Sequence, residues 1–258
     1  MLFHGEIAAL FDNFTPLPPS ELRDSIEKLA DGVGFPLANI FVVEGSKRSS
    51  HSNAYQSGLF QKKRIVIYDT LIEDYESIKG RENPTSEESQ DKKGSQDTDE
   101  QDKSKTKTGC NNQEILAILC HEIGHWYHSH LFKNLAFSEI NYFFIFLIFS
   151  RLYNDPTLYS AFGFDNERPV VIGFAVLMMI LTPYAELTGF IATVLSRKFE
   201  YQADQFARSK GRAEHLKSGL IKLSSDNLGF PVHDELYSTF NHSHPTLIQR
   251  LKALSKSE

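Results

Sequence analysis

Residues 120–126 of this 258-residue chain read Cys-His-Glu-Ile-Gly-His-Trp, and they follow an apolar stretch, 112–119, with helical spacing. On an α-helix of about 3.6 residues per turn, positions four apart lie one turn apart on the same face. His121 and His125 can therefore bind one metal ion together, and Glu122 lies beside that face. The pattern predicts a metal-binding helix whose glutamate can take a proton from a metal-bound water.

The composition excludes some classes of protein and of partner. The formal net charge is −6, so the chain lacks the basic character of a nucleic-acid-binding protein, and we predict no nucleic-acid partner. Cys110, placed in a polar linker, and Cys120 are not expected to form a disulfide, which fits a reducing compartment. Residues 1–10 contain Glu6 and only short apolar runs, so we expect no signal peptide.

We predict three regions along the chain. Residues 1–78 form a helix and a small antiparallel β-sheet. Residues 79–113 are rich in Glu, Asp, Lys, Ser, Gln and Thr; such a segment buries too little apolar surface to offset its ordering entropy, so it is expected to be a disordered linker. Residues 114–258 carry the metal site and a membrane hairpin.

The first region begins with an irregular segment, 1–18, followed by a helix that opens at Pro19 or Ser20 and ends at Gly32. Short strand-like runs follow, separated by turn residues, at 39–44, about 51–60, and 64–68. The sheet either serves only as a packing platform or offers an edge strand to an extended peptide. The residues themselves do not decide between these two roles.

Two apolar segments, about 133–153 and 169–195, predict a transmembrane hairpin, because about 20 apolar residues are needed to cross a bilayer. The alternative is a buried hairpin in a soluble protein. The run 142–149 is apolar all round, which disfavours that alternative. Arg197 and Lys198 end the second segment and mark its cytoplasmic side. We therefore expect membrane lipid as a partner.

Glu200 is the best candidate for a third metal ligand, because two histidines and one glutamate form a catalytic zinc set with a fourth position left to water. Asp204 lies one turn further on, where it can accept the N–H of a ligating imidazole and fix its tautomer. Arg197 can pair with either carboxylate. The competing interpretation of each residue is a charge on a solvated helix face. We predict one Zn²⁺ per chain.

Two residues near the C-terminus are candidates for contact with the reacting groups. His244 precedes Pro245, which suits the start of a helix, and Arg250 would lie inside that helix. Either side chain can stabilise an oxyanion or hold a substrate carboxylate. Four other histidines are interpreted as surface or cap residues: His128, His130, His233 and His242.

Four segments together carry a resemblance to a known family: 46–55, 121–126, 196–204 and 243–251. In this order, with an apolar hairpin between the second and third, the chain resembles the type I CaaX prenyl proteases, the a-factor-converting and prelamin A-processing zinc endoproteases. The resemblance implies a mainly α integral-membrane zinc metalloprotease that removes the last three residues of prenylated CaaX proteins. It also implies a multi-pass location in the endoplasmic reticulum or inner nuclear membrane, with the site facing the cytosol.

The resemblance also implies roles for particular residues. Zinc is assigned to His121, His125 and Glu200, the general base to Glu122, and a supporting role to Asp204. Asn53, His244 and Arg250 are expected to contact substrate or stabilise the transition state, which favours the peptide-binding role of the sheet edge. The chain corresponds to the C-terminal portion of such proteins, without their N-terminal transmembrane helices.

Two alternative functions stay open at this point. One is a membrane quality-control metalloprotease that cuts its substrates without requiring a prenyl group. The other is a truncated, non-catalytic membrane-bound relative that binds partners without cutting them. Turnover of non-prenylated peptides distinguishes the first alternative, and zinc binding without hydrolysis distinguishes the second.

Overall fold

A computed structural model of the chain describes residues 14–47, 51–58, 62–73, 75, 78, 109–230 and 232–256. The chain divides into two compact units. The first comprises Met1–Ile123, Phe206–Pro231 and Ser257–Glu258, and the second comprises Gly124–Gln205 and Val232–Lys256.

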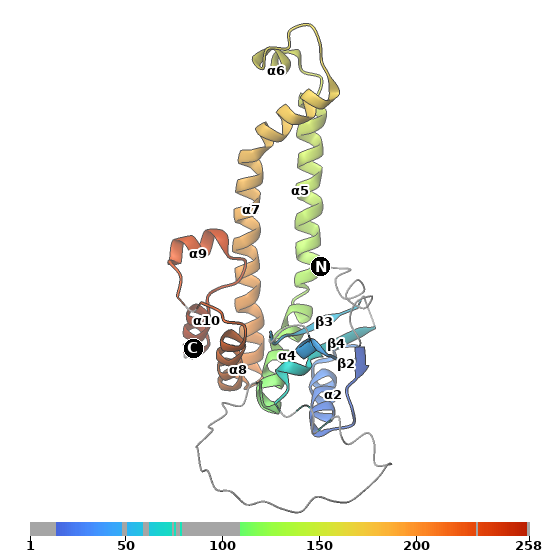
Figure 1. Cartoon of the computed structure of the whole chain (residues 1–258), viewed down its shortest axis with the longest axis vertical. Coiled ribbons are helices and arrows are strands. Elements are labelled where there is room, and N and C mark those ends of the chain that lie inside the picture. Colours follow the sequence, from blue (N-terminus) through green and yellow to red (C-terminus); the bar gives the residue numbers. More distant parts are fainter. Residues whose placement is uncertain are drawn as a thin grey trace, which may run out of the picture. The chain divides into compact units, whose positions relative to one another are not determined.

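The described residues form a small sheet and a larger set of helices (Figure 1). The strands are β1 (Phe14–Pro16), β2 (Leu37–Val43), β3 (Ala54–Ser57) and β4 (Lys63–Tyr68), with the short 3₁₀ turns η1 (Gly45–Lys47) and η2 (Asp69–Leu71). The first helices are α2 (Glu21–Val33), α4 (Asn112–Tyr127), α5 (His130–Leu152) and α6 (Pro156–Ala161). The remaining helices are α7 (Val170–Ser209), α8 (Ala213–Asp226), α9 (Glu235–Asn241) and α10 (Leu247–Ser255).

The sheet of the first unit is mixed, with strand order β1-β2-β4-β3. The predicted antiparallel sheet is therefore wrong at its centre, where β2 and β4 run parallel and align Ile40 with Ile65 and Val42 with Ile67. All four side chains are buried. Strands β3 and β4 form an antiparallel pair, and it is β4 rather than β3 that lies beside β2. Strand β3 is therefore at the edge of the sheet.

The ends of the first elements differ slightly from the prediction. Strand β1 lies within the segment expected to be irregular and pairs antiparallel with β2. Helix α2 begins as predicted after Ser20, whose side chain accepts a hydrogen bond from the N–H of Arg23. It ends at Gly34 rather than Gly32, because Gly34 adopts the left-handed conformation, with φ of 69°, that closes a helix. Its buried face consists of Leu22, Ile26 and Ala30.

Helix α4 is held at its start by a reciprocal cap. The side-chain oxygen of Asn111 accepts hydrogen bonds from the N–H groups of Gln113 and Glu114, and the Glu114 carboxylate accepts one from the Asn111 N–H. Ser218 and Lys222 of α8 also donate to that carboxylate, at 2.5 and 2.7 Å. The helix that carries the metal-binding motif is therefore fixed to α8 by a buried charge.

Part of the predicted linker is ordered. Cys110 is 1% exposed, and its N–H and C=O bond to Leu71 and Glu73, so residues 109–113 pack into the first unit. The predicted linker residues 79–108 lie outside the described part of the chain. As predicted, both cysteines are free thiols, and burial raises the pKa of Cys110 to about 12 and that of Cys120 to about 11.

In the second unit, α5 and α7 run to and from α6 as the two arms of a hairpin (Figure 1). Both helices are long and apolar enough to cross a membrane, by length and composition. The predicted spans 133–153 and 169–195 lie close to α5 and to the first part of α7. The apolar side chains of α5 point outward, with Phe143 63% and Phe146 69% exposed. A helix of this kind needs an apolar solvent or partner to cover it.

Candidate metal centre

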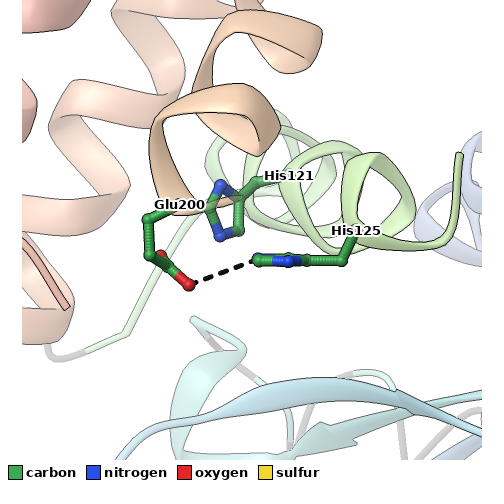
Figure 2. A group of neighbouring side chains, drawn as sticks. All are labelled: His121, His125 and Glu200. Atoms are coloured by element: carbon green, nitrogen blue, oxygen red, sulfur yellow. Dashed lines mark ion pairs between the residues drawn. The ribbon is translucent and has the colours of Figure 1, made fainter. Parts of the chain in front are cut away.

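The structure brings together the three residues predicted as metal ligands. His121 and His125 lie one turn apart on α4, and Glu200 lies on α7 (Figure 2). One potential ligand atom from each residue lies within 4.8 Å of the other two. His121 is 6% and Glu200 5% exposed. A charged carboxylate is buried to this extent only where a cation or hydrogen-bond donors compensate it.

The donor set fits a zinc ion. Nε2 of His125 lies 3.4 Å from a carboxylate oxygen of Glu200. Around a tetrahedral zinc with bonds of about 2.0 to 2.2 Å, two ligand atoms lie about 3.3 to 3.6 Å apart. Two imidazoles and one carboxylate are also the protein ligands of a hydrolytic zinc site. The residues present are therefore compatible with a bound zinc ion in both spacing and chemistry.

Glu122, the predicted general base, is half-buried on α4. Its backbone carbonyl accepts a hydrogen bond of 2.7 Å from the side chain of Gln56 in β3. This contact, which the sequence analysis did not anticipate, ties the edge strand of the sheet to the turn of α4 that carries Glu122.

Asp204 and Arg250, predicted for supporting and substrate-binding roles, form an ion pair. The Arg250 guanidinium donates to both carboxylate oxygens of Asp204, at 2.9 and 2.6 Å. Another of its nitrogens lies 3.6 Å from Glu200. Asp204 is 2% exposed, so the pair is largely removed from water. Arg250 therefore links the candidate ligand Glu200 to Asp204, one helical turn away.

His244 lies beside the same ligand. Its Nδ1 is 3.1 Å from a carboxylate oxygen of Glu200, while 63% of its side chain is exposed. As predicted, a helix begins after Pro245 and contains Arg250. Thr246 caps this helix, α10, through a reciprocal pair with Gln249.

Arg197 does not pair with Glu200 or Asp204, contrary to the prediction. It is 7% exposed and donates to oxygens of the segment that leads into α10. The acceptors are the carbonyls of Ser238, His242 and His244, the hydroxyl of Ser238 and the side chain of Gln249. The prediction relied on spacing along α7 alone, whereas the C-terminal segment supplies these acceptors. Arg197 thereby holds the backbone on which His244 is carried.

Asn53, predicted to bind substrate, lies exposed at the start of β3. Its side-chain oxygen accepts from the N–H of Ala54 at 2.9 Å, and its carbonyl accepts from Tyr68 in β4. The preceding residue is held by Asn227 at the end of α8, which accepts from the Ser52 N–H and donates to the Ser52 carbonyl. These bonds fix the position at which β3 begins.

Two residues next to the cluster, His130 and Gln202, were not predicted from the sequence. His130, interpreted as a surface or cap residue, is 3% exposed and lies 2.9 Å from His125, nitrogen to nitrogen. Its other ring nitrogen lies 3.0 Å from the side-chain oxygen of Gln202. A spacing of five residues is not a helical repeat, so periodicity gives no signal for this pair.

Comparison with known proteins identifies the family of this chain. Residues 16–258 match peptidase family M48. The chain is 47% identical to the CAAX prenyl protease 1 homolog of Mus musculus, over 100% of this chain and 55% of that protein. It is 40% identical to CAAX prenyl protease 1 of Saccharomyces cerevisiae, over 96% of this chain and 50% of that protein.

A crystal structure of S. mikatae Ste24p is similar with a TM-score of 0.74 and 39% identity, over 99% of this chain and 55% of that one. The chain thus spans about half the length of the curated relatives it matches. The family match covers nearly all of this sequence, and it includes the His-Glu-x-x-His helix and Glu200. This chain belongs to peptidase family M48.

Proposed function

We propose that this chain carries the catalytic centre of a zinc metalloendopeptidase that removes the last three residues of prenylated CaaX proteins. The observation that carries the proposal is the cluster of His121, His125 and Glu200, with Glu122 next to the first ligand in the sequence. The identity to proteins named CAAX prenyl protease 1 supports the choice of substrate class.

In this proposal His121, His125 and Glu200 hold one zinc ion, which supplies a Lewis acid and lowers the pKa of a bound water when present. The Glu122 carboxylate takes a proton from the attacking water and delivers it to the leaving amide nitrogen. Glu122 is half-buried on α4, directly after His121 in the sequence.

The edge of the sheet offers a place for the peptide. Among the described strands, β3 pairs only with β4, so its other edge is available to an added strand. The bond from Gln56 to the Glu122 carbonyl keeps that edge beside the general base. Asn53, at the start of β3, would contact the substrate backbone at one end of the added strand.

His244 and Arg250 have different roles in the proposal. His244 is mostly exposed beside Glu200, where an imidazole N–H can stabilise the oxyanion that develops on the scissile carbonyl. Arg250 is engaged by Asp204 and lies close to Glu200. These contacts support a role in holding the ligand carboxylate in place, in addition to the predicted contact with substrate.

We further propose that the protein is a multi-pass protein of the endoplasmic reticulum or inner nuclear membrane, with its site facing the cytosol. The lengths of α5 and α7 support a lipid environment. Lys133, near the start of α5, and Lys198, near the end of the apolar part of α7, support a cytosolic base of the hairpin. Protease protection of an epitope inserted between α6 and α7 tests this orientation.

The direct test is cleavage of a farnesylated CaaX peptide by the zinc-loaded chain in detergent, followed by mass spectrometry of the product. Release of the last three residues is expected, and Glu122→Gln should abolish it while zinc binding persists. The matched control is Glu214→Gln, which changes an exposed glutamate of α8. No cleavage by folded, zinc-loaded protein contradicts the proposal.

The same assay separates the two alternatives. Equal turnover of an otherwise identical non-prenylated peptide favours a quality-control protease without a prenyl requirement. Binding of one zinc per chain without any hydrolysis favours a non-catalytic relative. Selective turnover of the prenylated peptide supports the proposed substrate class over both.

A further inference from the structure

Three side chains in successive contact, those of His125, His130 and Gln202, lead away from the candidate metal site. Nδ1 of His125 lies 2.9 Å from Nδ1 of His130, and Nε2 of His130 lies 3.0 Å from Oε1 of Gln202. The His130 ring also stacks on Phe199, with 4.3 Å between ring centroids and 14° between planes. Helices α4, α5 and α7 each contribute one residue to this series.

A break between two helices makes the contact possible. On one continuous helix, residues five apart do not share a face. Here α4 ends at Tyr127, α5 begins at His130, and Ser129 between them adopts the left-handed conformation, with φ of 55° and ψ of 36°. A non-glycine residue held in this region costs free energy, so the surrounding packing must enforce the turn. The turn carries the His130 ring back to His125.

The two hydrogen-bond contacts allow only one consistent arrangement of protons if His125 binds a metal. Nε2 of His125 faces Glu200, so it is the nitrogen that would bind the metal with its lone pair, and the proton of the ring is then on Nδ1. That N–H must donate to Nδ1 of His130, whose proton is then on Nε2. An N–H at that position requires an acceptor, and the side-chain oxygen of Gln202 is the atom that faces it. The reverse arrangement would place a proton on the metal-binding nitrogen of His125.

We infer that His130 and Gln202 are positioning residues that fix the tautomer and the ring orientation of His125 for metal binding. The inference rests on the proposed metal centre. Partners that accept the second N–H of a ligating imidazole orient the ring and raise its basicity, and their loss weakens metal binding by about 10- to 100-fold. His130 does this with a neutral imidazole, and Gln202 keeps that imidazole in the tautomer that accepts.

The test is the zinc dissociation constant of the full chain in detergent, measured by competition with a fluorescent chelator. His130→Phe preserves the stacking on Phe199 but removes the acceptor, and Gln202→Met removes the oxygen that orients His130. Each should raise the dissociation constant by about 10- to 100-fold. Gln202→Glu keeps an acceptor oxygen and should bind zinc as tightly as the original chain. Gln205→Met is the matched control on the exposed face of α7.

The thermal stability of each metal-free variant is measured in parallel, so that a folding defect is recognised. His130→Phe and Gln202→Met interrupt the hydrogen bonds at different residues, so they test the inference independently. Unchanged zinc affinity in a folded His130→Phe or Gln202→Met variant overturns the inference, as does equal weakening by Gln202→Glu and Gln202→Met. If affinities follow the expected pattern but no peptide is cleaved, the inference stands and the proposed protease function fails. If the peptide is cleaved but the His130→Phe and Gln202→Met variants bind zinc with unchanged affinity, the proposed protease function stands and the inference fails.

Discussion

At the scale of single residues, Arg250 is shared between two carboxylates that are almost fully buried. Asp204 receives two of its hydrogen bonds, and Glu200 lies within 3.6 Å. The guanidinium and the imidazoles of His125 and His244 lie close enough to the Glu200 carboxylate to compensate part of its charge. With metal bound, Arg250 keeps Asp204 and Glu200 in register along one face of α7.

We predict that Arg250→Ala destabilises the protein by about 3 to 5 kcal/mol, because it leaves the buried charge of Asp204 without its partner. Arg250→Lys should recover only part of this, since an ammonium group cannot form the bidentate pair. Thermal unfolding in detergent measures both effects. Lys252→Ala, an exposed change on the same helix, is the control and should leave the melting temperature unchanged.

At the scale of elements, the start of α4 depends on Glu114. Burial alone would raise the pKa of its carboxyl, but hydrogen bonds from Lys222, Ser218 and the Asn111 N–H outweigh burial and lower the pKa below 4.5. The hydrogen bond to Glu114 in turn raises the pKa of Lys222 above 10.5. The pair therefore favours the charged form of both groups.

The pH dependence of stability follows from these two directions. The contribution of Glu114 is fully present above about pH 4.5 and is lost as the pH falls through its lowered folded pKa. The contribution of Lys222 is fully present below about pH 10.5 and is lost as the pH rises through its raised folded pKa.

Glu114→Gln should therefore lower the free energy of unfolding by about 1.5 to 3 kcal/mol between about pH 4.5 and 10.5. Below and above that range, the difference in stability between the variant and the original chain should become smaller. Melting temperatures across the pH range check this. The control is Glu214→Gln, since Glu214 is exposed and its pair with Lys217 is of the kind that contributes little. A difference that does not vary with pH would rule out the charged pair as its source.

The junction between α4 and α5 gives a second prediction at this scale. Ser129→Gly should leave stability and zinc affinity unchanged or improved, because glycine adopts the left-handed conformation freely. Ser129→Val should cost about 1 to 2 kcal/mol, because a β-branched side chain is poorly accommodated there. Because the turn presents His130 to His125, the valine variant should also bind zinc more weakly. Equal zinc affinities of the Ser129→Gly and Ser129→Val variants would contradict a role of the turn in metal binding.

At the scale of the whole molecule, the candidate ligands come from two helices that are far apart in the sequence. A metal ion bound to all three ligands must therefore stabilise the folded chain against unfolding. With free zinc at a thousand times its dissociation constant, the stabilisation is about 4 kcal/mol. We predict that chelation lowers the melting temperature and that zinc restores it. Glu200→Gln should reduce both effects, whereas a chelator-insensitive melting temperature would contradict a metal site.

Much of the architecture was predictable from local sequence patterns. The helical spacing of residues 112–125 located the motif on α4, and hydropathy located α5 and the first part of α7 to within a few residues, although α7 continues to Ser209. The three side chains that the structure brings together were predictable as candidate ligands, because His121 and His125 share a helix and because Glu200 lies in a segment that resembles a known family. The order of the strands was not predictable from the sequence, since the parallel pairing of β2 with β4 depends on how the segment between them is placed in the folded chain.

The sequence by itself determined α2, α4, α10, the free cysteines, the apolar hairpin and the three ligand candidates, because each depends on residues that are near in the chain or on composition. Only the tertiary structure decided the partners of the charged and polar groups. Arg197 donates hydrogen bonds to carbonyls before α10, Arg250 pairs with Asp204, and His130 contacts His125. The physical reason is that a buried polar group must be satisfied by whatever donor or acceptor folding brings to it, and sequence spacing does not encode that neighbour.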